Sequence, residues 1–333
     1  MKKSYILTEG SRSIGFGHIV RCIALYDELK KKKLNPHFIV SGDKNINFHL
    51  KGKNSTILNW QHNSKELRKL IENSDCIVVD SYKAAKKDYS SISKLTKLLV
   101  CIDDNNRVNY PSGIITNSAL NAIKLPYPKS QNKTYLLGEK YLLLRDSFKK
   151  VASKKTTNEL KAVLITLGGS DIRNLSNQVL SLLVKHYPNL KKIVIIGSGF
   201  RKKNVEKIKQ WKDKNVKLIY SPDAPTMKKY MQDVPIGISA SGQTINELSR
   251  IGLPTISIVV ADNQKNNALG WSKKGFTVNA GDWDDPDLFI NILNGMKKLA
   301  TKKERDKRTK IGQSLVDGLG AERIVNLIIK KLK

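Results

Sequence analysis

Short apolar runs that alternate with helical stretches are the feature that most limits how this chain can fold. In the first half these runs are SYILTE, PHFIV, DCIVVD and KLLVCIDD, followed by GIITN and KTYLLGE. Apolar runs of this length, bounded by polar residues, are typical of strands buried on both faces of a parallel sheet. A helical pattern starts at His18 between the first two runs, and residues 90–97 can supply another crossover. The alternation predicts an α/β fold with a doubly wound sheet.

The same alternation restarts after residues 149–160, a lysine-rich, weakly apolar stretch that is typical of a linker. Five strand candidates follow, KAVLITLGG, KKIVIIGSG, VKLIYS, VPIGISASG and LPTISIVVAD, and the closing segment 302–333 is helical. A chain of 333 residues fits about two domains of roughly 150 residues each. We therefore expect two doubly wound domains facing a cleft, over residues 1–150 and 151–333, with the last helix as a candidate to pack back on the first. Ligands in such sheets bind at the carboxyl ends of the strands.

Composition excludes some classes of protein. No apolar run approaches the roughly 18 to 20 residues of a membrane span, and residues 1–9 lack the apolar core of a signal peptide, so we expect a cytoplasmic protein. The formal net charge is +31, but the lysines are scattered along almost every expected helix and loop, with few aromatic residues between them. We predict no specific nucleic-acid partner. Plain surface lysine, attraction of an anionic substrate and weak association with an acidic membrane stay open as explanations.

The residue types that bind metals show no ligand spacing. The three cysteines, Cys22, Cys76 and Cys101, are an odd number without a CxxC pair, and each lies in an apolar segment, so we expect buried free thiols. Four histidines have no partner at the spacing of metal ligands: His37, His49, His62 and His186. The sequence therefore predicts neither a metal nor a cofactor, and it predicts no particular oligomeric state.

The stretch SIGFGHIVRC follows the first expected strand and leads into a helix. Gly15 and Gly17 permit backbone conformations or close approaches that a side chain would block. The dinucleotide pattern GxGxxG is incomplete, because Val20 and Arg21 occupy the region of its third glycine. His18 lies at the helix start, where the helix dipole disfavours a protonated ring, so it is a candidate general base. A histidine packed in the wall between the domains is the alternative.

The stretch SASGQTINEL follows a strand of the second half and opens a helix near Gln243. Small residues let phosphate oxygens approach, and the free N–H groups of a helix start bind them. Glu247, one turn into the helix, is placed to accept hydrogen bonds from the vicinal hydroxyls of a ribose. The predicted UDP-binding residues are Ser241, Gly242, Gln243, Thr244 and Glu247. The alternative is that Ser241 and Thr244 only cap the helix and that Glu247 is a surface residue.

Three other loops follow strands and bring small or polar groups to the same edge of a sheet, in LGGSDIRN, ADNQ and VVDSY. Their candidate site residues are Gly168, Gly169, Asn263, Gln264 and Tyr82. Asp171 is expected to cap the helix that follows it, and Asp80 is the alternative to Tyr82 as the site residue of its loop. For Asn263 and Gln264 the alternative is ordinary loop polarity.

Taken together and in this order, IGFGHIVRC, VVDSY, LGGSDIRNLS, ISASGQTINEL and VVADNQ resemble the UDP-sugar hydrolases of pseudaminic acid biosynthesis. The resemblance extends from the first strand to about Gly275. It implies the GT-B architecture of two Rossmann-like domains, which that family shares with the lipid-linked N-acetylglucosaminyl transferase of peptidoglycan synthesis. It also implies conversion of UDP-2,4-diacetamido-2,4,6-trideoxy-beta-L-altropyranose and water into the free sugar and UDP.

The resemblance also implies roles for individual residues. His18 matches the base of the glycine loop, Tyr82 and Asn263 match further catalytic positions, and Gln264 matches a substrate-binding one. The UDP-binding positions are those given above, and Gly15, Gly17, Gly168 and Gly169 lie in loops that face the substrate. One departure concerns the exact sugar more than the reaction: family members often carry R-x-D before the glycine loop, whereas this chain has Thr8, Glu9 and Gly10.

The chemistry that such a reaction needs can be stated independently. Glycosidases commonly use two carboxylates because a sugar alkoxide must be protonated as it leaves. UDP is already a stable anion, so a base for water and donors for the departing diphosphate are sufficient. We therefore expect inversion at the anomeric carbon without a metal. The alternatives are a GT-B glycosyltransferase with a sugar or lipid acceptor, and a nucleic-acid-binding protein, which the charge alone supports.

Overall fold

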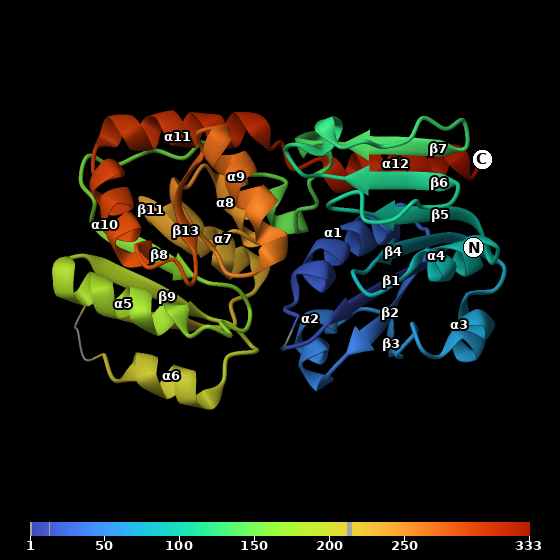
Figure 1. Cartoon of the computed structure of the whole chain (residues 1–333), viewed down its shortest axis with the longest axis horizontal. Helices are drawn as coiled ribbons and strands as arrows, with labels where there is room; N and C mark the ends of the chain where they lie inside the picture. Colours follow the sequence, from blue (N-terminus) through green and yellow to red (C-terminus); the bar gives the residue numbers. More distant parts are fainter. Residues whose placement is uncertain (1, 13, 212–214) are drawn as a thin grey trace. The chain divides into compact units, whose positions relative to one another are not determined.

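The computed structural model describes residues 2–12, 14–211 and 215–333, which form two compact units (Figure 1). The first unit comprises residues 1–146 and 318–333, and the second comprises residues 147–317. The helix α12 (Gly320–Lys331) follows the second unit in the sequence but belongs to the first. Within the described ranges, no helix is long and apolar enough to cross a membrane.

The first unit is built on a parallel sheet of seven strands in the order β3-β2-β1-β4-β5-β6-β7. The strands are β1 (Ser4–Gly10), β2 (Pro36–Gly42), β3 (Ser55–Ile57), β4 (Ser74–Asp80), β5 (Thr96–Ile102), β6 (Gly113–Asn117) and β7 (Lys133–Leu137). The six strands predicted for this half are present. The short edge strand β3 was not predicted.

Helices cover both faces of this sheet because consecutive strand residues point to opposite sides. Ile6 packs in the cluster that contains the apolar residues of α1 (Gly17–Lys31) and α12, whereas Leu7 packs with those of α3 (Ser64–Ile71) and α4 (Lys86–Ser93). Shorter helical segments are η1 (Lys44–Ile46), α2 (Asn47–Leu50), η2 (Ala122–Lys124), η3 (Glu139–Tyr141) and η4 (Asp146–Phe148). The predicted doubly wound sheet is confirmed.

The last helix, α12, is part of the core of the first unit. Its first residue, Gly320, lies so close to the backbone of Tyr141 and Leu142 that a Cβ there would be 2.2 Å from the carbonyl oxygen of Leu142. Ile324 and Ile328 are fully buried against α1. At its far end, Lys2 Nζ donates a hydrogen bond of 3.0 Å to the carbonyl of Leu332.

The second unit contains a parallel sheet of six strands in the order β10-β9-β8-β11-β12-β13. The strands are β8 (Ala162–Thr166), β9 (Lys191–Ile196), β10 (Val216–Tyr220), β11 (Ile236–Ala240), β12 (Thr255–Val259) and β13 (Thr277–Asp282). The helical elements are α5 (Leu175–His186), α6 (Lys202–Lys209), α7 (Ala224–Asp233), α8 (Thr244–Ile251), η5 (Asp262–Gln264), α9 (Lys265–Lys273), α10 (Leu288–Lys298) and α11 (Lys302–Leu315). The five strands predicted here are present, and the edge strand β13 was not predicted.

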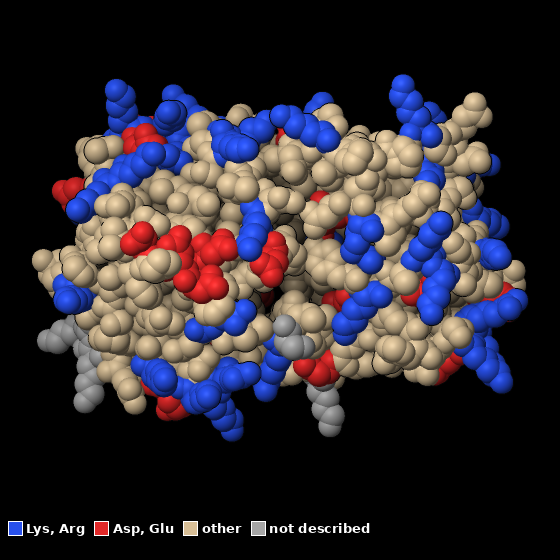
Figure 2. Space-filling view, in the orientation of Figure 1, with Lys and Arg blue, Asp and Glu red and all other residues tan. Residues whose placement is uncertain are grey.

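Residues 149–160 contain no helix or strand, as expected for a connecting segment. The segment is nevertheless anchored, because the half-buried Lys154 donates from Nζ to the carbonyls of Met231, Gln232 and Val234 at the end of α7, over 3.1, 2.8 and 2.8 Å. The three cysteines are buried and free, which confirms that prediction. Figure 2 shows Lys and Arg side chains spread widely over the visible face, without one continuous basic stripe.

Candidate active site

The glycine-rich loop connects β1 to α1, where the sequence places it. Gly15 has a φ of +83°, a conformation that favours glycine, and it exchanges two backbone hydrogen bonds with Ser11, of 3.2 and 2.8 Å. Apart from its chain neighbours and its own helix backbone, a Cβ at Gly17 would meet no atom of the described residues within 4 Å. The loop conformation therefore requires Gly15, whereas Gly17 leaves open space beside the start of the helix.

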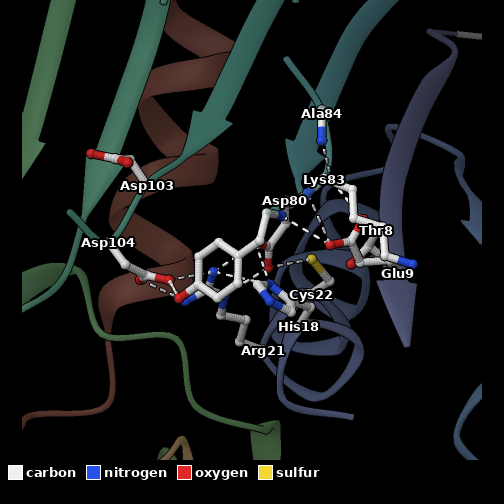
Figure 3. Close-up of polar contacts among 12 residues, drawn as sticks. Thr8, Glu9, His18, Arg21, Cys22, Asp80, Lys83, Ala84, Asp103 and Asp104 are labelled. Carbon is white, nitrogen blue, oxygen red and sulfur yellow. Dashed lines mark hydrogen bonds and ion pairs between the residues drawn. The ribbon is translucent and has the colours of Figure 1, made fainter. Parts of the chain in front are cut away.

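His18, the second residue of α1, lies against the carboxylate of Asp80 at the end of β4 (Figure 3). The distance from His18 Nδ1 to Asp80 Oδ1 is 2.7 Å, and both side chains are buried. Burial alone would raise the pKa of Asp80, but the adjacent Arg21 and His18 hold that pKa well below its usual range. Because an ionised carboxylate can only accept, Nδ1 donates to Asp80, and the Arg21 Nη2 donor also lies 3.2 Å from Nδ1. When the ring carries one hydrogen, on Nδ1, Nε2 is its acceptor nitrogen. From the sequence, only the helix dipole was expected to act on the His18 ring. The structure adds a carboxylate that orients this ring.

Arg21 links two carboxylates beside His18. It lies one turn further along α1, on the same side of the helix as His18. Its Nε and Nη2 donate to the two oxygens of Asp80, both at 2.6 Å, and its Nη1 and Nη2 donate to those of Asp104, at 2.7 and 3.0 Å. Burial raises the pKa of Asp104, but Arg21 outweighs this effect, so that pKa is also lowered. Both carboxylates are thus ionised partners of one guanidinium.

Tyr82 lies against both His18 and Asp104. Its hydroxyl donates a hydrogen bond to Asp104 Oδ2. Its ring meets the His18 ring edge to face, with 4.5 Å between the centroids and 89° between the planes. The structure therefore brings together His18 and Tyr82, two of the predicted catalytic residues, together with Asp80, the alternative residue of the same loop.

The contacts of Glu9 explain part of the departure from the family pattern R-x-D, in whose place this chain has Thr8, Glu9 and Gly10. The Glu9 carboxylate is buried and accepts hydrogen bonds from Gln61 Nε2 at 2.7 Å, Ser81 Oγ at 2.6 Å and the backbone N–H of Tyr82 at 2.9 Å. It therefore holds the loop that carries Tyr82. In this chain the segment before the glycine loop has a structural role at the edge of the site.

Three residues of this cluster were not predicted from the sequence: Glu9, Arg21 and Asp104. A signal existed for two of them. Asp104 ends the run KLLVCIDD, directly after a strand, and Arg21 is three residues from His18 on the expected helix. Asp103, the residue before Asp104, points away from this cluster (Figure 3) and accepts hydrogen bonds from Tyr110 and Tyr127. In the part of the chain that the structure describes, no three His, Cys, Asp or Glu side chains are arranged to hold a metal.

In the second unit, the residues predicted to bind the diphosphate lie at the start of α8. Ser241 is fully buried, and its Oγ has no hydrogen-bond partner among the described residues. Gln243 is the N-cap residue and makes no capping hydrogen bond through its side chain, and Thr244 is the first residue of the helix. The alternative in which Ser241 caps the helix is therefore wrong. Glu247 lies in the first turn and is 2% exposed, so the alternative of a surface residue is also wrong.

The loops after β11 and β12 touch each other. Gln264 Oε1 accepts a hydrogen bond of 3.2 Å from Val260 N, and its Nε2 lies 3.3 Å from the place where a Cβ of Gly242 would be. Asn267 Nδ2 donates a hydrogen bond of 2.7 Å to the carbonyl of Ser241. Gln264 is thus brought to the predicted UDP-binding loop, whereas Asn263 is exposed on η5.

The glycines after β8 differ in what they accommodate. Gly168 has a φ of +89° and open space where a Cβ would lie. Gly169 is instead approached closely by another segment of the protein itself. A Cβ on Gly197 would be 2.3 Å from the Gly169 carbonyl oxygen. Asp171 accepts hydrogen bonds of 2.9 Å from the backbone N–H groups of Leu175 and Ser176, which confirms that it caps α5.

Comparison with known proteins connects both units to nucleotide-sugar enzymes. Residues 162–318 match the family model of the glycosyltransferase family 28 C-terminal domain. A Helicobacter pylori protein named pseudaminic acid cytidylyltransferase and UDP-2,4-diacetamido-2,4,6-trideoxy-beta-L-altropyranose hydrolase is 27% identical over 263 residues, which are 78% of this chain and 44% of that protein. The Campylobacter jejuni protein named as the same hydrolase is 22% identical over 290 residues, 81% of this chain and 96% of that one. The resemblance found in the sequence is confirmed.

An uncharacterised protein of Methanocaldococcus jannaschii is 27% identical over 284 residues, 82% of this chain and 58% of that protein. The chain thus spans about half the length of two of the curated relatives that it matches. Among solved structures, Acinetobacter baumannii MurG has a TM-score of 0.65 at 11% identity and covers 99% of this chain and 100% of its own. MnaA of Staphylococcus aureus, in a co-structure with UDP, has a TM-score of 0.70 at 14% identity and covers 100% of this chain and 97% of its own. These structures confirm the GT-B fold.

Proposed function

We propose that the protein hydrolyses a UDP-linked diacetamido-trideoxyhexose, UDP-6-deoxy-AltdiNAc, at the anomeric C–O bond. The products are the free sugar and UDP, and the reaction is a step of pseudaminic acid biosynthesis. The observation that carries the proposal is the His18 ring, oriented through Nδ1 by an ionised carboxylate and packed against Tyr82. The similarity of most of the chain to two proteins named for this hydrolysis supports the choice of substrate.

In this mechanism His18 is the general base. Its Nε2 takes one hydrogen of a water molecule while the water oxygen forms a bond to the anomeric carbon. The bond from that carbon to the UDP oxygen breaks, and its electron pair leaves with UDP. Asp80 fixes the tautomer that leaves Nε2 free and stabilises the imidazolium that forms. Attack from the face opposite UDP inverts the anomeric configuration.

The departing diphosphate needs hydrogen-bond donors, which the start of α8 supplies in this proposal. The backbone N–H groups at Gly242, Gln243 and Thr244 bind its oxygens, and the Ser241 hydroxyl, which has no hydrogen-bond partner within the described ranges, donates to them. Glu247 accepts from the ribose hydroxyls. Helix N–H groups, rather than a metal ion, hold the diphosphate. The remaining substrate contacts are assigned to Gly15, Gly17, Gly168, Gly169, Asn263 and Gln264.

The test is release of UDP from the purified protein with the UDP-sugar in water. The wild type should release UDP and free sugar in equal amounts. His18→Ala should lower kcat by 10²- to 10⁴-fold, the range of general base catalysis. His62→Ala, at an exposed histidine of the same unit, is the matched control and should leave kcat unchanged. A His18→Ala rate within tenfold of the wild type would contradict the assignment of the base.

A glycosyltransferase is the second candidate, because residues 162–318 match a glycosyltransferase domain and the fold is GT-B. In that case a sugar or lipid hydroxyl takes the place of water. UDP release that depends on an added acceptor, with negligible release in its absence, would favour this alternative.

A further inference from the structure

His18 and four other side chains form a closed ring of contacts. From His18 the contacts run to Asp80, from Asp80 to Arg21, and from Arg21 to Asp104. Asp104 accepts from the Tyr82 hydroxyl, and the Tyr82 ring returns to His18. This ring of contacts joins α1 to the loops after β4 and β5 (Figure 3). Tyr82 is therefore coupled to His18 both by ring contact and through two carboxylates.

Asp104 decides which way the Tyr82 hydroxyl points. The Arg21 guanidinium outweighs the effect of burial and keeps the pKa of Asp104 below its usual range, so this carboxylate is ionised near neutral pH. An ionised carboxylate can only accept, so the hydroxyl hydrogen of Tyr82 points at Asp104. Any second hydrogen bond of Tyr82 Oη is therefore one in which this oxygen accepts. A phenol held in this way offers an acceptor, not a proton, to the substrate side.

The charge of the cluster also fits a role in the reaction. Two carboxylates share one guanidinium, which leaves one negative charge in surroundings that are largely buried. A purely structural ion pair needs only one carboxylate, and an uncompensated charge in such a place costs free energy. The charges of four groups, the Asp80 and Asp104 carboxylates, the Arg21 guanidinium and the His18 ring, balance when His18 carries a proton. The second carboxylate thus stabilises the state that forms as the base takes its proton.

We propose that Arg21 and Asp104 are positioning residues that make Tyr82 an acceptor, so that Tyr82 Oη and His18 Nε2 hold the two hydrogens of the attacking water. This inference rests on the proposed hydrolysis. One hydrogen passes to His18 Nε2 as the water oxygen bonds to the anomeric carbon. The bond to UDP breaks with its electron pair on UDP, and the hydrogen held by Tyr82 stays on the new sugar hydroxyl. With both hydrogens held, a lone pair of the water points at the carbon.

A double-mutant cycle between Asp104 and Tyr82 tests this inference. Asp104→Asn introduces an amide that donates to the phenol oxygen, and Tyr82→Phe removes that oxygen. Each single variant should lower kcat by about 10- to 100-fold, because a misplaced nucleophile costs up to about 100-fold, and should change KM by less than about threefold. If Asp104 acts through Tyr82, the double variant has the kcat of Tyr82→Phe within about twofold.

Tyr127→Phe is the matched control, since the Tyr127 phenol donates to the adjacent carboxylate, Asp103. It should leave kcat unchanged. Asp104→Glu keeps an ionised acceptor and should retain more activity than Asp104→Asn. If Asp104→Asn does not fold, as judged by circular dichroism, Asp104→Ser replaces it in the cycle.

Two results would overturn the inference. The first is a wild-type kcat in Asp104→Asn. The second is a loss from Asp104→Asn that is as large in the Tyr82→Phe background as in the wild type, which would make the carboxylate merely structural. Both presume that the wild type releases UDP in water. A wild type that does not do so would refute the proposed function itself, and this inference with it.

Discussion

Replacing Asp80 by asparagine should abolish most of the activity, although the two side chains have the same shape. Asp80 accepts four hydrogen bonds: from His18 Nδ1, Arg21 Nε, Arg21 Nη2 and Cys22 Sγ. Asparagine has only one acceptor oxygen. Its NH₂ group must face either Arg21 Nε, where two donors repel each other, or His18 Nδ1, where it forces the hydrogen of the ring onto Nε2.

The expected magnitude follows from these contacts. With the hydrogen on Nε2, His18 cannot accept a proton from water there. The ring then loses its general-base contribution, which is typically about 10²- to 10⁴-fold in rate. Loss of the tautomer-fixing carboxylate from a Ser-His-Asp triad costs about 10⁴-fold. We expect kcat to fall about 10³-fold. Breaking a buried ion pair costs about 3 to 5 kcal/mol, and Asp104 still neutralises Arg21, so we expect a loss of about 2 kcal/mol in the free energy of unfolding.

UDP release and thermal unfolding measure the two effects. Asp75→Asn is the matched control, because Asp75 is also a carboxylate of β4, paired at 2.8 Å with Lys97 but far less enclosed. It should keep the wild-type kcat. The reasoning would be refuted if Asp80→Asn folded and retained kcat within about tenfold of the wild type, because His18 would then not depend on this carboxylate.

Three further predictions concern pH and the open positions of the site. Burial, aided by Arg145, lowers the pKa of His49 to about 4; because a histidine of the unfolded chain protonates near 6.5, the first unit should lose on the order of 3 kcal/mol of stability as the pH falls from 6.5 to 4. His49→Phe keeps an aromatic ring against Phe16 and should remove most of this loss in thermal unfolding at pH 7 and 4.5; an unchanged pH dependence would place its origin elsewhere. Gly17→Ala should not lower the unfolding temperature, since a Cβ there meets no atom within 4 Å, but it should raise KM for the UDP-sugar about tenfold by blocking approach to the backbone; an unchanged KM would exclude that approach. Ser241→Ala removes a buried hydroxyl that has no partner among the described residues, so stability should not fall, while the Kd for UDP measured by calorimetry should rise about fivefold; equal affinities would remove Ser241 from the UDP site.

The central strands could be predicted because strands buried on both faces appear as continuous apolar runs. The two strands that were not predicted, β3 and β13, lie at sheet edges. β3 has only three residues, STI, with Ile57 half exposed, and β13 has the sequence TVNAGD, with few apolar residues. An edge strand buries less surface, so its sequence carries a weaker hydrophobic signal.

The candidate site could be predicted only where local sequence decides the structure. A glycine loop before a helix places His18, and a small-residue loop before a helix places Ser241, since both are properties of short segments. Arg21 and Asp104 are 83 positions apart in the chain, and their contact arises because β4 lies between β1, which leads into α1, and β5 in the sheet. Pairing at that distance depends on strand order and on the direction of each side chain, which one sequence does not specify.

The central claim is that water is the acceptor, and proton NMR of the purified protein with UDP-6-deoxy-AltdiNAc in buffer tests it most directly. The spectra follow the loss of the UDP-sugar and the anomer of free sugar that appears first. We predict UDP and free sugar in equal amounts, with the configuration at the anomeric carbon inverted in the first spectra. An intact UDP-sugar, or UDP release only after an acceptor is added, would contradict the claim.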